Sequence, residues 1–242
     1  MIYPIIFLIA VAIAPMSAHA RPNEPQKHLS YQTKLDRLLK RQDYAEVINT
    51  LALEPSANKR VAWLESKLSE RHTMLIFELA LQLLKAKPSL KTYYFETLPF
   101  FRAAIAMLVL DCSCTSDKSV GGAVGSLAFA YAMQFEEQLE RYSQVERDAY
   151  EKKHQIETEK VNLYKCKEIL NPYTTAAITQ MPSPAWVFPH GLGAVLGEEN
   201  EIPPSQWNTI RQEMAIAYME EIEEDLFQLE NDPEGFLQKI SE

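Results

Sequence analysis

The chain has 242 residues and a formal net charge of −9, with 24 basic residues against 33 acidic ones. This length suits one domain, with or without a small appendage, and is ample for a hydrophobic core. The acidic balance disfavours nucleic acid and anionic membrane surfaces as partners, because both carry charge of the same sign. A protein partner with a basic surface is electrostatically easier.

The first 20 residues contain no Lys, Arg, Asp or Glu, and an apolar run extends from Ile2 to Ala14. Ala18-His19-Ala20 then matches the small-x-small pattern after which signal peptidase cleaves. The Lys or Arg that usually opens a signal peptide is missing, but the run is shorter than the ~20 apolar residues of a spanning helix. We therefore predict a signal peptide over 1–20 and cleavage near Ala20, which makes the mature chain periplasmic or secreted. Retention of this segment as a membrane anchor is the alternative.

Beyond the leader, the sequence predicts one helical domain. Residues 21–28 are polar and contain prolines, as in the disordered start of a mature protein. From residue 29 onward, apolar residues recur at spacings of three and four, and strand-like alternation is nearly absent. We predict an all-α fold, a single domain over 29–242 built of antiparallel helical hairpins. A long loop rich in Pro and Gly precedes its C-terminal helix.

Residues 29–110 are predicted to hold the N-terminal helices. A first helix extends from Leu29 to Gln42, and Asp43 and Ser56 can cap the two that follow. Met74 to Leu84 is then apolar on nearly all sides, a pattern typical of a helix in the centre of a domain.

Two further apolar segments, 98–110 and 120–133, are expected to join this core. Gly121, Gly122 and Gly125 open the second segment, and we interpret them as allowing close helix packing. The two segments also resemble a hairpin that enters a membrane. Each has only 13 or 14 residues and Arg102 interrupts the first, so a buried core hairpin is favoured.

Residues 120–170 could form one long helix or a helical hairpin. Ser143 and Glu146 have the spacing of a capping box, which favours a new helix after residue 143. Cys112, Cys114 and Cys166 favour the hairpin too, because a disulfide is expected in an oxidising compartment. One helix would hold Cys166 ~70 Å from the other two, whereas bridged Cα atoms lie within ~7 Å. We therefore predict a disulfide from Cys166 to Cys112 or Cys114, with the choice between these two open.

Residues 171–205 differ in kind, with six prolines, three glycines and no helical period. Long irregular segments in compact domains are uncommon and often functional. Trp186, Phe188 and His190 in this loop either plug the core or present a rigid apolar anchor to a partner. Residues 206–242 are predicted to form a C-terminal helix and a short end helix. The long helix carries an acidic cluster that is either a solvated face or a partner-binding surface: Glu220, Glu221, Glu223, Glu224 and Asp225.

No arrangement of residues predicts catalysis, a cofactor or a metal. A zinc site needs about four Cys or His ligands at defined spacings, and here two of the three cysteines share one loop while the histidines are scattered. The Cys-x-Cys pair lacks the Cys-x-x-Cys spacing of thiol–disulfide enzymes. The glycines at 121–125 lack the Lys-Ser/Thr of a phosphate loop, and no serine-nucleophile motif is present. We therefore predict no catalytic residues, no cofactor and no metal ligands.

Three functional classes fit these features. The first is an exported, non-catalytic protein-binding protein of the immunity or inhibitor type, whose partner is a toxin or a secretion-system component. The second is a periplasmic hydrolase-like enzyme with its site beneath the 181–197 loop, using His190 and carboxylates of the last helix as acid and base. The third is a membrane-active protein that uses the 98–133 apolar hairpin.

Overall fold

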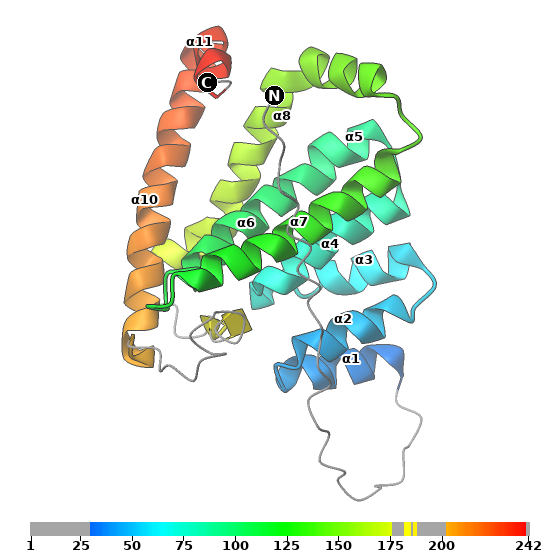
Figure 1. The fold of residues 1–242 in the computed structure, drawn as a ribbon, viewed down its shortest axis with the longest axis vertical. Helices are drawn as coiled ribbons and strands as arrows, with labels where there is room; N and C mark the ends of the chain where they lie inside the picture. Colours follow the sequence, from blue (N-terminus) through cyan, green and yellow to red (C-terminus); the bar gives the residue numbers. More distant parts are fainter. Residues whose placement is uncertain (1–29, 176–181, 185, 188–201, 241–242) are drawn as a thin grey trace, which may run out of the picture.

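The computed structural model describes residues 30–175, 182–184, 186–187 and 202–240. Every regular element among these residues is a helix (Figure 1), which confirms the all-α prediction. The segments 1–20 and 21–28, for which we predict a signal peptide and a disordered start, lie outside the described residues, as do Phe188 and His190. In chain order the elements are α1 (Tyr31–Lys40), α2 (Tyr44–Ala52), α3 (Ala57–Glu65), η1 (Leu68–Glu70), α4 (Thr73–Ala86), α5 (Leu90–Thr92), η2 (Tyr93–Thr97), α6 (Leu98–Cys112), α7 (Ser119–Leu139), α8 (Gln144–Leu170), η3 (Asn171–Thr174), α10 (Pro204–Asn231) and α11 (Pro233–Lys239).

The first three helices begin at side-chain caps. Ser30, Asp43 and Ser56 each accept a hydrogen bond from the backbone N–H three residues further on. These bonds satisfy donors that a helix N-terminus leaves free. The caps predicted at Asp43 and Ser56 are therefore confirmed.

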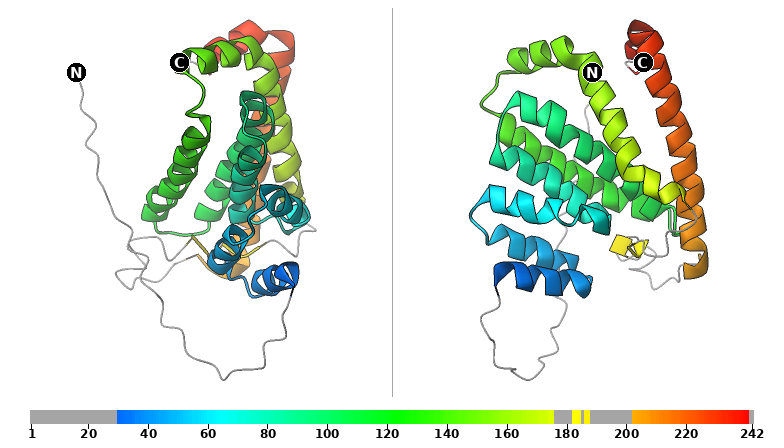
Figure 2. Two further views of the ribbon diagram at one scale, coloured as in Figure 1. Left: turned by 90° about the vertical axis from the view of Figure 1, so that its right-hand side faces the viewer. Right: turned by 180° about the vertical axis from the view of Figure 1, so that it is seen from behind.

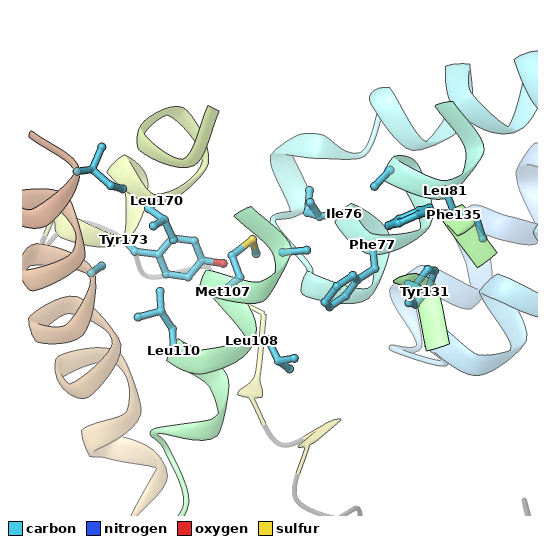
Figure 3. Close-up of a cluster of buried hydrophobic side chains, with 14 of the residues drawn as sticks. Ile76, Phe77, Leu81, Met107, Leu108, Leu110, Tyr131, Phe135, Leu170 and Tyr173 are labelled. Carbon is cyan, nitrogen blue, oxygen red and sulfur yellow. The ribbon is translucent and has the colours of Figure 1, made fainter. Parts of the chain in front are cut away.

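Helix α4 is the centre of the molecule and contacts two hydrophobic clusters. Leu75, Leu79 and Leu83 pack on the side that faces α1, α2 and α3. Phe77 and Leu81 pack on the other side, among residues of α6, α7, α8 and α10 (Figure 3). A helix buried on all sides can afford almost no polar face, which is why its sequence predicted a central position.

Helix α7 is buried on one side only. Its inner residues Tyr131 and Phe135 pack around Phe77 and Phe101, with ring centroids 5.0–5.1 Å apart in two of the pairs. Its outer residues Phe129 and Met133 are 66% and 54% exposed. The expectation that 120–133 belongs to the buried core therefore holds for its inner side and is wrong for its outer side. Figure 2 shows the reason: α7 is the outer layer on one side of α4 and α6, whereas α8 and α10 cover the other side.

The glycines of α7 do not serve close packing within the chain. A Cβ atom added at Gly121, Gly122 or Gly125 would meet nothing within 4 Å among its surroundings. This overturns the interpretation that they let another helix of this chain approach.

Among the described helices, none has the length and apolar character needed to cross a bilayer.

The turn predicted at Ser143 is confirmed. The Ser143 side chain accepts from the Glu146 N–H, and the Glu146 carboxylate accepts from the Ser143 N–H, so both halves of the capping box form. The helices on either side, however, have different main neighbours. Helix α7 packs on α4 and α6, whereas α8 packs on α6 and α10, so the two do not form the closely packed hairpin that we expected.

Two pairs of polar contacts show that α8 runs parallel to the segment formed by η2 and α6. The Tyr94 hydroxyl donates to Glu151 at 3.2 Å, and Arg102 donates to both carboxylate oxygens of Glu159 at 2.5 and 3.0 Å. The sequence separation is 57 residues in each pair, and a constant separation requires two helices that run in the same direction. Antiparallel hairpins therefore do not describe this part of the domain.

Helix α10 runs antiparallel to α8. Lys160 pairs with Glu230 at 3.2 Å and Lys167 pairs with Glu223 at 2.8 Å. Moving seven residues forward on α8 therefore corresponds to moving seven residues back on α10. These exposed pairs contribute little energy individually, but they show how the two helices are aligned.

Cys112, Cys114 and Cys166 are described and none of them is in a disulfide, so the predicted bond is absent. Extending the parallel alignment puts Cys166 beside Val109, near the end of α6. The turn at 143 therefore brings Cys166 closer to Cys112 and Cys114 than one continuous helix would. The thiol of Cys114 instead faces α10, with the carbonyl oxygens of Leu110 and Trp207 each 3.6 Å away. Burial raises the pKa of each thiol to about 11. All three are therefore protonated at neutral pH, and the thiolate needed for oxidation is scarce.

Replacing Gly121, Gly122 or Gly125 with Ala should raise the free energy of unfolding by about 0.5–1 kcal/mol per site. Each change removes the entropic cost of a helical glycine, and the added methyl group meets open space. Gly235→Ala is the matched control, because its Cβ would collide with the Asp232 carboxylate that caps α11. Urea denaturation measures all four variants, and a loss of stability at the α7 sites would contradict this account.

Candidate functional site

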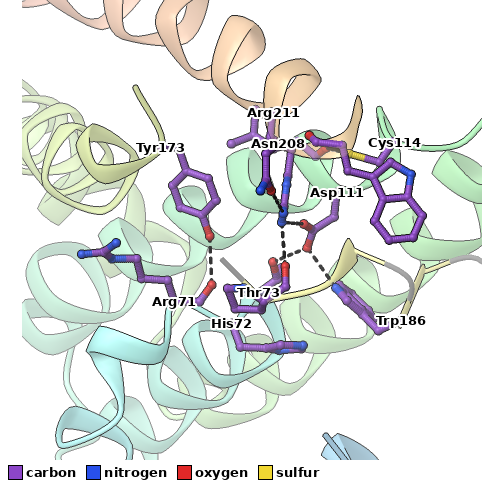
Figure 4. A network of polar contacts seen from close by, with 12 residues as sticks. Arg71, His72, Thr73, Asp111, Cys114, Tyr173, Trp186, Asn208 and Arg211 are labelled. Atoms are coloured by element: carbon purple, nitrogen blue, oxygen red, sulfur yellow. Dashed lines mark hydrogen bonds and ion pairs between the residues drawn. The ribbon is translucent and has the colours of Figure 1, made fainter. Parts of the chain in front are cut away.

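The described part of the 171–205 segment is anchored on a buried carboxylate. Asp111 lies in the last turn of α6 and is 6% exposed. One of its oxygens accepts from the Thr73 hydroxyl at 2.8 Å and from the Trp186 indole N–H at 2.9 Å. Its other oxygen lies 3.4 Å from a guanidinium nitrogen of Arg211 (Figure 4). The start of α4, the end of α6, the loop and α10 therefore meet at one carboxyl group.

Arg211 connects α10 to the loop from the opposite side. It is 2% exposed and donates to the Pro182 carbonyl at 2.8 Å and to the Asn208 side chain at 2.9 Å. Its Nε has no hydrogen-bond partner among the described residues. The guanidinium thus neutralises Asp111 while holding a loop carbonyl in place.

The environment of Asp111 contains opposing electrostatic effects. The pKa of its carboxyl is raised above the usual value, because burial outweighs the hydrogen bonds from Trp186 and Thr73 and the charge of Arg211, which act to lower it. Removing two charges from water costs about as much as their attraction returns, so a buried pair adds little net stability. Losing one partner is costly, because the other charge remains buried without compensation. We conclude that this pair mainly determines how α10 and the loop are positioned on α6.

His72 and Tyr173 border the same site. The His72 ring is buried and stacks on Tyr44 with centroids 3.4 Å apart, while its Nδ1 accepts from the Met74 N–H and caps α4. Burial lowers the pKa of His72 to about 3, so the imidazole is neutral at physiological pH. The Tyr173 hydroxyl donates to the Arg71 carbonyl at 2.9 Å and ties η3 to the start of α4.

Trp186 is half-buried, and its indole N–H faces the core. Its indole N–H is bonded to Asp111, its ring centroid lies 5.7 Å from that of His72, and the adjacent Val187 is fully buried. Of the two roles predicted for the loop aromatics, these contacts of Trp186 favour that of a core plug. Phe188 and His190 lie outside the described residues. The position of His190 relative to the carboxylates of α10, on which the enzyme hypothesis depends, is therefore not tested.

The acidic cluster lies on the outer side of α10 and is neutralised only in part. Glu223 pairs with Lys167 at 2.8 Å, and Asp225, which is half-buried, pairs with Lys239 at 3.0 Å. Glu220, Glu221 and Glu224 are exposed and make no ion pair within the described part of the chain. Three negative charges therefore face solvent on one helix.

Two exposed apolar side chains share this side of α10. Ile216 is 40% and Phe227 is 70% exposed. Residues 216, 220, 224 and 227 follow one another at spacings of four, four and three, so they lie along one face of a helix. We call Ile216, Glu220, Glu221, Glu224 and Phe227 the α10 outer face.

Sequence reasoning missed Asp111, Arg211 and Phe227. Arg211 follows Trp207 by four residues and precedes Met214 by three, so it lies within the apolar stripe predicted to face inward. A charged residue at such a position signals a buried ion that needs a partner. Phe227 gives the converse signal, because it directly follows the inward Leu226 and so lies out of phase with the stripe.

No group of three or more His, Cys, Asp or Glu side chains in the described ranges is arranged to hold a metal ion. No protein-family model matches the chain, and no curated protein or solved structure is detectably similar to it. Function must therefore be argued from the residues alone.

Asp111→Ala should lower the free energy of unfolding by about 3–5 kcal/mol, because it leaves the Arg211 charge buried without compensation. Lys167→Ala, which removes one member of an exposed pair, should cost at most about 1 kcal/mol and serves as the control. Denaturant titration followed by circular dichroism measures both. Equal costs for the two variants would contradict the role assigned to Asp111.

His72 should make stability depend on pH between 6.5 and about 3. In this range the unfolded chain binds a proton at residue 72 and the folded chain does not, so stability falls as the pH falls. The expected loss reaches about 4 kcal/mol at the lower end. His72→Asn keeps an acceptor to cap α4 and removes the titration. Below pH 6.5 the unfolding free energy of the wild type, minus that of this variant, should fall steadily as the pH falls. A difference that stays constant would show that His72 does not titrate in this way.

Proposed function

We propose that this chain is an exported, non-catalytic helical protein that binds another protein through the α10 outer face. The observation that supports the proposal best is Phe227, a large aromatic side chain that is 70% exposed beside unpaired carboxylates. Aromatic anchors surrounded by polar groups are common where proteins bind one another. The negative rim favours a partner with a basic surface.

The architecture supports the proposal because it holds this face rigidly. Arg211 fixes the first turns of α10 to Asp111 and the loop. Further along, Ile222, Leu226 and Leu229 are buried beneath the outer face, and the pairs with Lys160 and Lys167 align α10 on α8. A preorganised surface loses less conformational entropy on binding.

The predicted leader and the net charge of −9 favour a partner outside the cytoplasm. A folded, acidic helical protein that masks a basic surface fits an immunity or inhibitor role against a toxin or a secretion-system component. The α10 outer face as defined does not include the loop aromatic Trp186, whose indole N–H is bonded to Asp111.

The binding test compares three versions of the mature chain as baits in extracts of the cell envelope and medium. The first is the wild type, and the second carries Glu220→Lys, Glu224→Lys and Phe227→Ala. The third carries the matched changes Glu65→Lys, Glu137→Lys and Leu53→Ala at exposed positions on other helices. A stoichiometric protein should bind the wild type and the third version. Its Kd for the second should be weaker by at least about a hundredfold, equal to about 2.7 kcal/mol.

Rising salt should slow association of the wild type, because the attraction is between exposed charges. A partner that binds the second version as tightly as the wild type would exclude the α10 outer face. Recovery of no stoichiometric partner would count against the protein-binding class as a whole.

A further inference from the structure

A polar cleft opens between α2, α3, α4 and α7, away from the α10 outer face. Its volume is about 280 Å³, at or just below the lower end of the range of small-molecule sites. Such a cleft accommodates a metabolite of few heavy atoms. Its lining contains a buried carboxylate, two cations and a short apolar wall.

The carboxylate is that of Glu78, which is 6% exposed. One oxygen accepts from the Gln82 amide at 2.6 Å and the other from the Tyr131 hydroxyl at 3.1 Å. No cation in the described residues lies within ion-pair distance of it. A buried charge is costly unless it is paired, and each carboxylate oxygen retains a lone pair for a second donor.

The two cations in the lining are bonded to neutral oxygens. Arg60 donates to the Gln82 side chain at 2.6 Å and to the Glu54 carbonyl, and Lys85 lies 3.4 Å from the Gln134 side-chain oxygen. Glu78 and Lys85 are seven residues apart on one side of α4, which separates them by about 10 Å along the helix. Arg60 lies near Glu78, because the Gln82 amide accepts from Arg60 and donates to Glu78. Glu78 therefore forms a negative end of the cleft, and Lys85 forms a positive end.

We propose that this cleft binds a small zwitterion with a primary ammonium, a carboxylate and a short aliphatic chain between them. The ammonium contacts Glu78 and supplies the missing positive charge. The carboxylate lies at Lys85, which is bonded only to the neutral side chain of Gln134. Between the two ends, Ile48 and Leu81 provide an apolar wall for the methylene groups.

Isothermal titration calorimetry of the intact chain tests the proposal with unbranched ω-amino acids from glycine to aminohexanoate. The monofunctional probes are n-butylamine and butyrate. One chain length should bind with a Kd of about 1 mM or below, at least about tenfold tighter than either monofunctional probe. Absence of binding by every ω-amino acid up to about 10 mM would overturn the proposal.

Variants assign each end of the ligand. Glu78→Gln keeps the shape and an acceptor for Tyr131, and it should weaken binding of the preferred ω-amino acid at least about tenfold. Lys85→Gln, at a half-buried position that tolerates change, should weaken it to a similar extent. Glu157→Gln and Lys153→Gln, both exposed on α8, are the matched controls and should leave Kd unchanged.

Circular dichroism and the melting temperature establish that each variant is folded, and Lys85→Gln keeps the test decisive if Glu78→Gln does not fold. Tighter binding of n-butylamine to Lys85→Gln than to the wild type would show that Lys85 is itself the counter-ion of Glu78. That result, like equal binding by wild type and both cleft variants, would overturn the two-ended site.

Discussion

The buried carboxylate of Asp111 is the constraint on which the arrangement of this protein depends. A charge that is 6% exposed must be matched by donors, and the chain supplies them from three directions: Thr73 on α4, Trp186 in the loop and Arg211 on α10. A shift of α10 that separated Arg211 from Asp111 would leave both charges buried without a partner, at a cost of about 3–5 kcal/mol. The position of α10, and hence of its outer face, follows from this contact.

A second constraint comes from the alignment of α8. It runs parallel to α6, with pairs separated by 57 residues, and antiparallel to α10. These contacts leave α7 on the far side of α4, with Phe129 and Met133 toward solvent. The two sides of the molecule therefore differ in character. One presents the acidic α10 outer face, and the other presents α7, which has three glycines in open surroundings and whose only charged residues, Glu136 and Glu137, lie in its last turn.

The proposed binding face and the proposed ligand cleft rest on the same kind of reasoning about charge. At Asp111 the chain supplies its own counter-charge, and the result is structural. On the α10 outer face, Glu220, Glu221 and Glu224 make no ion pair among the described residues. Glu78 is bonded only to the neutral side chains of Gln82 and Tyr131. Carboxylates that have no cation beside them can attract a positively charged partner or ligand.

Local pattern was enough to predict the helical class, the caps at Asp43 and Ser56, the turn at Ser143 and the central burial of 74–84. Each of these depends on residues within a few positions of one another, where capping and periodicity operate. The same pattern failed for α7 and for the disulfide, because burial and thiol pairing depend on which distant segments arrive as neighbours. Only the folded chain puts Asp111 against Arg211, 100 residues away, and Glu78 against Tyr131, 53 residues away. A sequence shows that a charge lies in an apolar stripe, and the tertiary structure decides whether that charge finds a partner.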